Sequence, residues 1–99
     1  MTEVQLTRWQ GIPSMVTARD GDEVVKIPLP ARFQEAIDEA AMRAGETDAD
    51  AYLAGWARDP WVAAEGTPAE AAATLAQALE DEWDQERLDE HVSDYGGGR

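Results

Sequence analysis

The chain has 99 residues and a formal net charge of −13, because 21 acidic residues outnumber eight Lys and Arg. It has no cysteine and one histidine, which excludes disulfide frameworks, thiolate metal sites and most nucleophile–base pairs. A surface of this charge repels phosphate backbones and anionic lipids, so we expect no direct binding to nucleic acid or to membranes.

The length suits one domain with a single core. The first residues read MTEVQLTRWQ, and they predict neither a signal peptide nor a membrane span, since they carry charge and lack an apolar run. We therefore expect a soluble cytoplasmic protein. It should have one domain over residues 1–95 and a flexible glycine-rich tail over residues 96–99.

The first third of the chain predicts a three-stranded antiparallel meander. Val4 and Leu6 alternate with polar residues, as in a half-buried strand, and Gly11 interrupts the pattern. Two further strands are predicted over residues 12–19 and 24–29. Because proline cannot donate a ladder hydrogen bond, Pro13 indicates that the second strand begins irregularly or lies at an edge.

The motif Asp20-Gly21-Asp22 predicts the hairpin between the second and third strands, because Asp-Gly accepts positive φ. If its first two residues form the turn, Val16 faces Val25. If its last two residues form the turn, Val16 faces Ile27. Both registers place these three aliphatic side chains on one face of the sheet.

Two helices are predicted in the middle of the chain, over residues 31–44 and 48–58. Pro30 suits a helix start, and Gly45 ends the first helix because glycine adopts the left-handed cap conformation without strain. Thr47 caps the second helix, with Asp50 three residues later in a pattern similar to a capping box. The apolar stripes contain Phe33, Ile37, Ala40, Ala41 and Ala44 in the first helix and Ala49, Tyr52, Leu53 and Trp56 in the second.

A third helix is predicted over residues 68–90, after an apolar segment at 61–64 that is a short loop or a strand too brief to assign. Thr67-Pro68-Ala69-Glu70 combines a cap, a proline at the first helical position and a glutamate three residues after the cap. Leu88 and Val92 lie more than a quarter turn from the apolar stripe of this helix. Either the helix bends near Asp84, or a second face contacts another element.

These elements predict an α+β domain, in which about three helices pack on one face of a three-stranded antiparallel sheet. Each strand and helix has one apolar face, and two packed layers bury all of these faces. The predicted core consists of Val16, Val25, Ile27, Phe33, Ile37, Tyr52, Leu53, Leu75 and Leu79.

No arrangement of residue types identifies a catalytic or metal centre, so we predict no metal and no cofactor. His91 has acidic neighbours, but zinc sites use several His or Cys ligands. Asp20-Gly21-Asp22 lacks the downstream glutamate of a calcium loop and is better explained as the hairpin turn. Glu65, which follows an apolar segment, comes closest to an isolated carboxylate, so a small carboxylate-based enzyme is the alternative function.

Five residues predict a surface that binds a partner. Tryptophans usually fill a core, and the alternative is an aromatic contact surface, to which Trp9 is assigned because it lies opposite Val4 and Leu6 on its strand. Met42 lies opposite Phe33 on its helix. The partner is either another protein, whose basic patch the charge of −13 would attract, or a second copy in a homodimer. The predicted partner-binding residues are Trp9, Met42, Arg43, Leu88 and Val92.

Two parts of the chain resemble a known family. The central helices read LPARFQEAIDEAAMRAG and DADAYLAGW, and the first strands read RWQGIPSMVTAR, a tryptophan followed by an Ile-Pro pair. Both parts resemble the small bacterial virulence factor domain family, and the similarity extends from Val4 to Leu88. The chain departs from the family pattern at Gln10-Gly11, where Arg-Asp is usual, and at Ser14-Met15, where Ala-Gln is usual.

The resemblance brings no reaction, cofactor or catalytic residue with it. It implies an accessory protein for folate- or cobalamin-linked methyl-transfer enzymes. Together with the scarcity of catalytic residue types, it favours a non-catalytic protein-binding module. The alternatives are a small carboxylate-based enzyme and a homodimeric structural protein.

Overall fold

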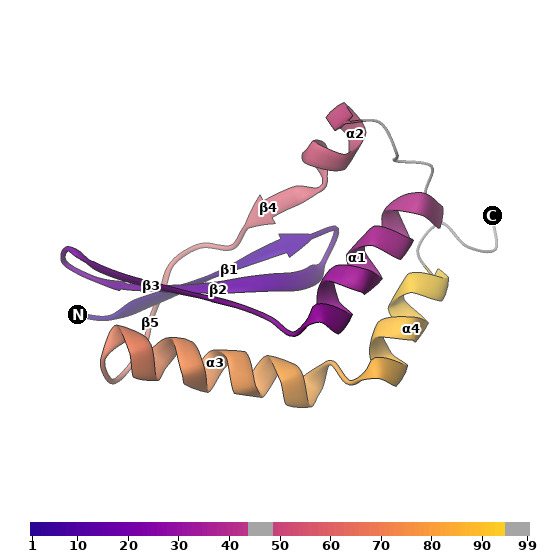
Figure 1. Ribbon diagram of the computed structural model, residues 1–99. Coiled ribbons are helices and arrows are strands. Elements are labelled where there is room, and N and C mark those ends of the chain that lie inside the picture. The colour runs from indigo at the N-terminus through magenta and orange to yellow at the C-terminus, as the bar shows by residue number, and fades with distance from the viewer. Residues whose placement is uncertain (44–48, 95–99) are drawn as a thin grey trace.

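The computed structural model describes residues 1–43 and 49–94 and folds them into five strands and four helices (Figure 1). The strands are β1 (Glu3–Trp9), β2 (Ile12–Asp20), β3 (Glu23–Pro28), β4 (Trp56–Arg58) and β5 (Val62–Ala63). The helices are α1 (Ala31–Arg43), α2 (Ala49–Ala54), α3 (Pro68–Glu82) and α4 (Gln85–Asp94). The predicted α+β class is confirmed. The predicted caps at Gly45 and Thr47 lie outside the described residues.

The sheet is antiparallel throughout, as predicted, but it has more than the three strands expected. The strand order is β3-β2-β1-β4, and β5 pairs with the N-terminal part of β1. The predicted helix over residues 48–58 is wrong at its end, because α2 stops at Ala54 and residues 56–58 pair with β1. Gly55, the residue after α2, is buried so close to the Trp9 indole of β1 that a side chain there would overlap the ring. The brief apolar segment after Trp61 is the strand β5.

The predicted third helix is two helices, so the total is four rather than about three. Helix α3 ends at Glu82, and Asp84 then caps α4, since its Oδ1 accepts a hydrogen bond of 2.8 Å from the Arg87 backbone amide. The chain therefore bends near Asp84, which was one of the two alternatives. At the other end of α3, the predicted capping box between Thr67 and Glu70 is present.

The hairpin adopts the second of the two predicted registers. Val16 lies opposite Ile27, so Gly21 and Asp22 form the turn. Gly21 has φ of +61°, a left-handed conformation that glycine adopts without strain. Val25 pairs with Ala18 in this register and shares the face of Val16, as predicted.

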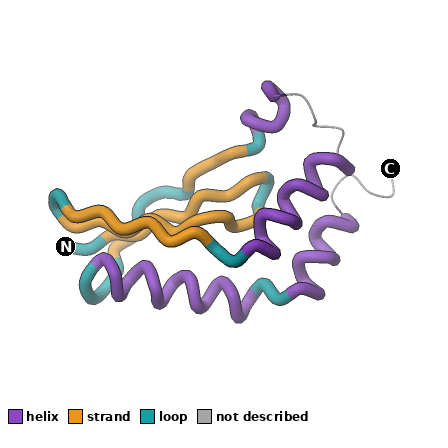
Figure 2. The backbone as a smooth tube through the Cα atoms, in the orientation of Figure 1, coloured by secondary structure: helices purple, strands orange, loops and turns teal. Residues whose placement is uncertain are grey.

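The molecule has two layers (Figure 2). Helix α3 runs along one side of β1, β2 and β3, while α1 and α4 pack side by side at one end of the molecule (Figure 1). Of the predicted core residues, Val16, Phe33, Ile37 and Leu79 are buried, and Val25, Ile27, Tyr52 and Leu75 are half-buried at the margin of the core.

Leu53 is a wrong core prediction, because its side chain is 63% exposed. Helix α2 has only six residues and contacts the sheet through Tyr52, whose ring stacks on Trp9 with 5.7 Å between centroids. The next helical residue points about 100° away, so Leu53 faces solvent.

Trp9 is fully buried, although strand alternation predicts it on the face opposite Leu6. The two residues are three positions apart, yet both belong to the core, because the register between β1 and β2 shifts after Thr7. Thr7 pairs with Met15 and Arg8 pairs with Pro13. Ser14 of β2 therefore lies opposite no residue of β1, and the alternation of faces is interrupted there. The Trp9 indole Nε1 then donates a hydrogen bond of 2.7 Å to the Tyr52 carbonyl.

Replacing Phe33 with Ala should lower the free energy of unfolding by about 3–5 kcal/mol, because this buried ring lies in the centre of the core. Leu53→Ala is the control, and it should change stability by less than about 0.5 kcal/mol because its side chain faces solvent. Urea denaturation followed by circular dichroism measures both variants. Equal losses would contradict the burial that distinguishes the two positions.

Gly55→Ala should destabilise the fold by about 1–3 kcal/mol through overpacking. A Cβ at this position would overlap the Trp9 indole and lie 2.6 Å from its Cε2 atom. The indole cannot move aside without giving up its hydrogen bond to Tyr52. The midpoint of thermal unfolding reports the effect, with Ala54→Ser at the adjacent exposed position as control. If both variants unfold at the wild-type temperature, Gly55 is not constrained by Trp9.

The α3 capping box should make stability depend on pH. Hydrogen bonds from the backbone amide of Thr67, and then from its side chain, lower the pKa of the Glu70 carboxyl from its usual 4.5. A lowered pKa stabilises the fold above the unfolded value, and this contribution disappears as pH falls through the folded value. Wild type should therefore lose stability relative to Glu70→Gln as pH falls from above the unfolded pKa of the Glu70 carboxyl to below its folded pKa, measured by denaturation at each pH. Parallel pH profiles would exclude this contribution.

Candidate functional site

The five predicted partner-binding residues do not form one surface. Trp9, Leu88 and Val92 are buried in the core, and this burial corrects their predicted place on the surface. Met42 is 71% exposed on α1, and the side chain of Arg43 lies outside the described residues.

Leu88 and Val92 are buried because α4 is a separate helix. The helix ends at Glu82 and a new helix begins at Gln85, so the apolar face of α4 need not continue that of α3. Leu88 and Val92, which lie off the apolar stripe of α3, form the core-facing stripe of α4. This stripe packs where α4 meets α1. A change of helix direction therefore explains the apparent second apolar face.

The other side of the sheet offers a surface that the sequence reasoning missed. Along β2, Met15, Thr17 and Arg19 alternate with the core residues Val16 and Ala18. Residues Gln5 and Thr7 of β1 and Val24 and Lys26 of β3 lie on the same side by the same alternation. We call this surface the open face, because α3 lies on the opposite side of the strands (Figure 1).

The open face contains a cleft of about 240 Å³. Strand β4 contributes to it because Arg58 pairs with Thr7 of β1, and Trp61 joins from the connection between β4 and β5. The lining combines three cationic side chains (Arg19, Lys26, Arg58), three apolar ones (Met15, Val24, Trp61) and three neutral polar ones (Gln5, Thr7, Thr17).

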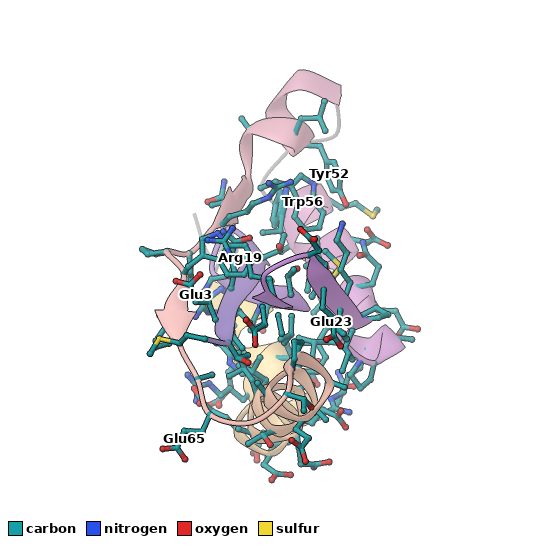
Figure 3. The ribbon with its side chains drawn as sticks, turned by 90° about the vertical axis from the view of Figure 1, so that its left-hand side faces the viewer. Glu3, Arg19, Glu23, Tyr52, Trp56 and Glu65 are labelled. Atoms are coloured by element: carbon teal, nitrogen blue, oxygen red, sulfur yellow. The ribbon has the colours of Figure 1, made fainter. Side chains whose placement is uncertain are left out.

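Arg19 is held in place by two contacts. Its guanidinium carbon lies 3.8 Å from the centre of the Trp61 ring, which is a close cation–π contact. Its Nε donates a hydrogen bond of 3.1 Å to Oε1 of Glu3, the residue opposite it on β1. Figure 3 shows the Glu3 and Arg19 side chains next to each other at this end of the sheet. Arg19 therefore joins β1, β2 and the segment around Trp61.

Lys26 and Arg58 have a different environment. Both side chains are exposed, and neither forms an ion pair within residues 1–43 and 49–94. Three of the eight Lys and Arg residues of the chain thus line one cleft. No acidic residue of the described chain belongs to this lining, and Glu3, which pairs with Arg19, lies beside it. In a chain of net charge −13, this cleft is a local site for negative charge.

The sequence contains part of the signal for this site. Alternation within the predicted strands places Arg19, Val24 and Lys26 opposite the core face. Arg58 could not be assigned to that face, because residues 56–58 were predicted as helix rather than as a strand beside β1. Trp61 gave no indication of its position, since its segment had no predicted partner.

Glu65, the predicted carboxylate, lies elsewhere. It borders a groove of about 460 Å³ whose lining includes Val4, Ala71 and Leu75, and its side chain is exposed. A carboxyl group acts as a general acid where burial stabilises its protonated form. The surroundings of Glu65 do not provide that burial.

His91 packs against the turn between β1 and β2. Its Nε2 lies 3.4 Å from the Gln10 carbonyl oxygen, and its ring meets Trp83 edge to face at 5.5 Å. Within the described residues, no three His, Cys, Asp or Glu side chains converge as metal ligands would. None of the helices α1 to α4 combines the length and the apolar character needed to cross a lipid bilayer.

Comparison with known proteins identifies a family but no detailed relative. No curated protein and no solved structure matches the chain. The family model described as Virulence factor matches residues 7–92, which include β2 to β5, α1 to α3, parts of β1 and α4, and all of the cleft except Gln5. The chain therefore belongs to the Virulence factor family, as the motifs in its first strands and central helices suggested.

Proposed function

We propose that this protein is a non-catalytic module that binds a protein partner on the open face of its sheet. The observation that carries the proposal is the cleft itself, in which cationic and apolar side chains lie together on the side of the sheet opposite α3. Tryptophan and arginine are enriched at the residues that dominate binding energy in interfaces, and Arg19 and Trp61 contact each other here.

The lining of the cleft favours binding over catalysis. It contains arginine, lysine, threonine and glutamine, which donate hydrogen bonds, together with the apolar Met15, Val24 and Trp61. Nucleophilic or acid–base chemistry would need a histidine, a carboxylate or an activated hydroxyl beside a base. The alternative, an enzyme that uses Glu65, has no comparable support, because that side chain is exposed.

The position of the cleft also favours a macromolecular partner. Its residues come from β1, β2, β3, β4 and the segment at Trp61, so a partner would contact most of the sheet. Val24 is 55% exposed at the margin and would be covered on binding. The family resemblance makes a methyl-transfer enzyme the first partner to test, and a second copy of the chain is the other candidate.

Thr7→Trp should block the cleft, because Thr7 lies between Met15 and Arg58 and a large side chain would fill the space there. Tryptophan is well tolerated in strands, so the fold should be retained, and thermal unfolding checks this. Tagged protein expressed in its native cell is captured under mild cross-linking, and its partners are quantified by mass spectrometry. Capture should fall by about tenfold or more, which corresponds to 1.4 kcal/mol.

Met42→Ala is the matched control, because it removes the exposed residue of the surface predicted from sequence. It should leave capture unchanged. If Met42→Ala reduces capture and Thr7→Trp does not, the partner binds at α1 rather than on the open face. If wild type captures no partner and is monomeric by light scattering, the binding-module proposal is wrong.

A further inference from the structure

We infer that the partner presents an acidic segment to the open face, with carboxylates bound by Lys26 and Arg58 beside Arg19. This inference rests on the proposed function and specifies the chemistry of the partner. It reverses the sequence-based expectation, in which the acidic surface of this chain attracts a basic partner.

The charges of the cleft carry the argument. Lys26 lies opposite Thr17 on the neighbouring strand, and Arg58 lies opposite Thr7, so both project from the same side of the sheet as Arg19. Arg19 already has Glu3 as a partner, whereas Lys26 and Arg58 have no ion pair among the described residues. A neutral surface that covered these two cations would remove their hydrating water and offer no compensating charge. Carboxylates on the partner would offset this loss of hydration free energy.

The segment is expected to lie across the face rather than to extend the sheet at β3. Strand β3 is the last in the strand order, so its outer edge could in principle accept another strand. However, Lys26 sits within it and Pro28 ends it. Lysine and proline are residues that proteins place on edge strands to prevent further pairing.

Nucleic acid fits the same cleft less well. A single strand carries one phosphate per nucleotide, and the net charge of −13 opposes such a density of negative charge. Proteins that bind single strands stack bases on aromatic rings. Trp61 is the one aromatic residue in the cleft lining among the described residues, and the Arg19 guanidinium covers one side of its ring. An acidic polypeptide needs only a few carboxylates at the correct spacing.

The experiment measures binding of a defined acidic probe by fluorescence anisotropy. The probe is a fluorescein-labelled peptide of alternating Glu and Val, about eight residues long, and the same peptide with Gln for Glu is the neutral control. The acidic peptide should bind more tightly than the neutral one, and its affinity should fall as salt rises from about 0.05 M to about 0.3 M. Lys26→Glu and Arg58→Glu should each weaken its binding by about tenfold or more.

Arg87→Glu is the matched control, since it makes the same charge change on α4, where Arg87 contacts Trp83 and Glu82. It should leave the affinity within about twofold of wild type, because the net charge alone does not decide binding. Three results would each overturn the inference. These are equal binding of the neutral peptide, an equal loss with Arg87→Glu, and tighter binding of a thymidine oligonucleotide of about twelve nucleotides.

The same variants separate this inference from the proposed function. If Thr7→Trp abolishes capture of the native partner while Lys26→Glu and Arg58→Glu retain it, the open face binds a partner whose segment is not acidic. The proposed function then stands and the inference is wrong. If all three variants capture the partner as wild type does, the open face is not the binding surface.

Discussion

The packing of Trp9 is the constraint on which the candidate site depends. The register shift after Thr7 turns the indole into the core, where it fits because Gly55 has no side chain and the Tyr52 carbonyl accepts its hydrogen bond. This contact brings α2 to the end of β1 and directs the following residues back along β1 as β4. Trp56 then pairs with Trp9, and Arg58 reaches the position opposite Thr7. A buried residue thus places a cation on the open face.

The sequence was sufficient for features that depend on local patterns. The hairpin at Gly21, the helix over most of residues 31–44 and the capping box at Thr67 each follow from residue types at fixed spacing. The face shared by Val16 and Ile27 was also predictable, because strand alternation fixes it in either register. The α+β class follows from these elements and is confirmed.

Features that depend on contacts between distant residues could not be predicted. Residues 56–58 form the strand β4 because they pair with β1. The three-residue segment alone has no pattern that predicts a strand. Trp9 was placed on the wrong face because alternation fails across the register shift. Pro13 predicted an irregular start of the second strand and lies at this shift, but it did not indicate which face Trp9 would take. The cleft combines locally predictable residues with distant ones. Strand alternation predicted that Arg19 and Lys26 point away from the core, whereas Arg58 could not be placed because β4 was not predicted.

The positive charge of the cleft and the negative net charge of the chain act at different distances. At physiological ionic strength, charges in solvent are screened beyond about 8 Å, so the net charge of −13 chiefly influences the approach of large, highly charged molecules. Within the cleft, Arg19, Lys26 and Arg58 are the charged lining residues, and no acid lines the cleft among the described residues. The surrounding acids therefore disfavour polyanions in general, while the cleft favours a short acidic segment that fits it. Such an arrangement gives selectivity for a local charge pattern rather than for total charge.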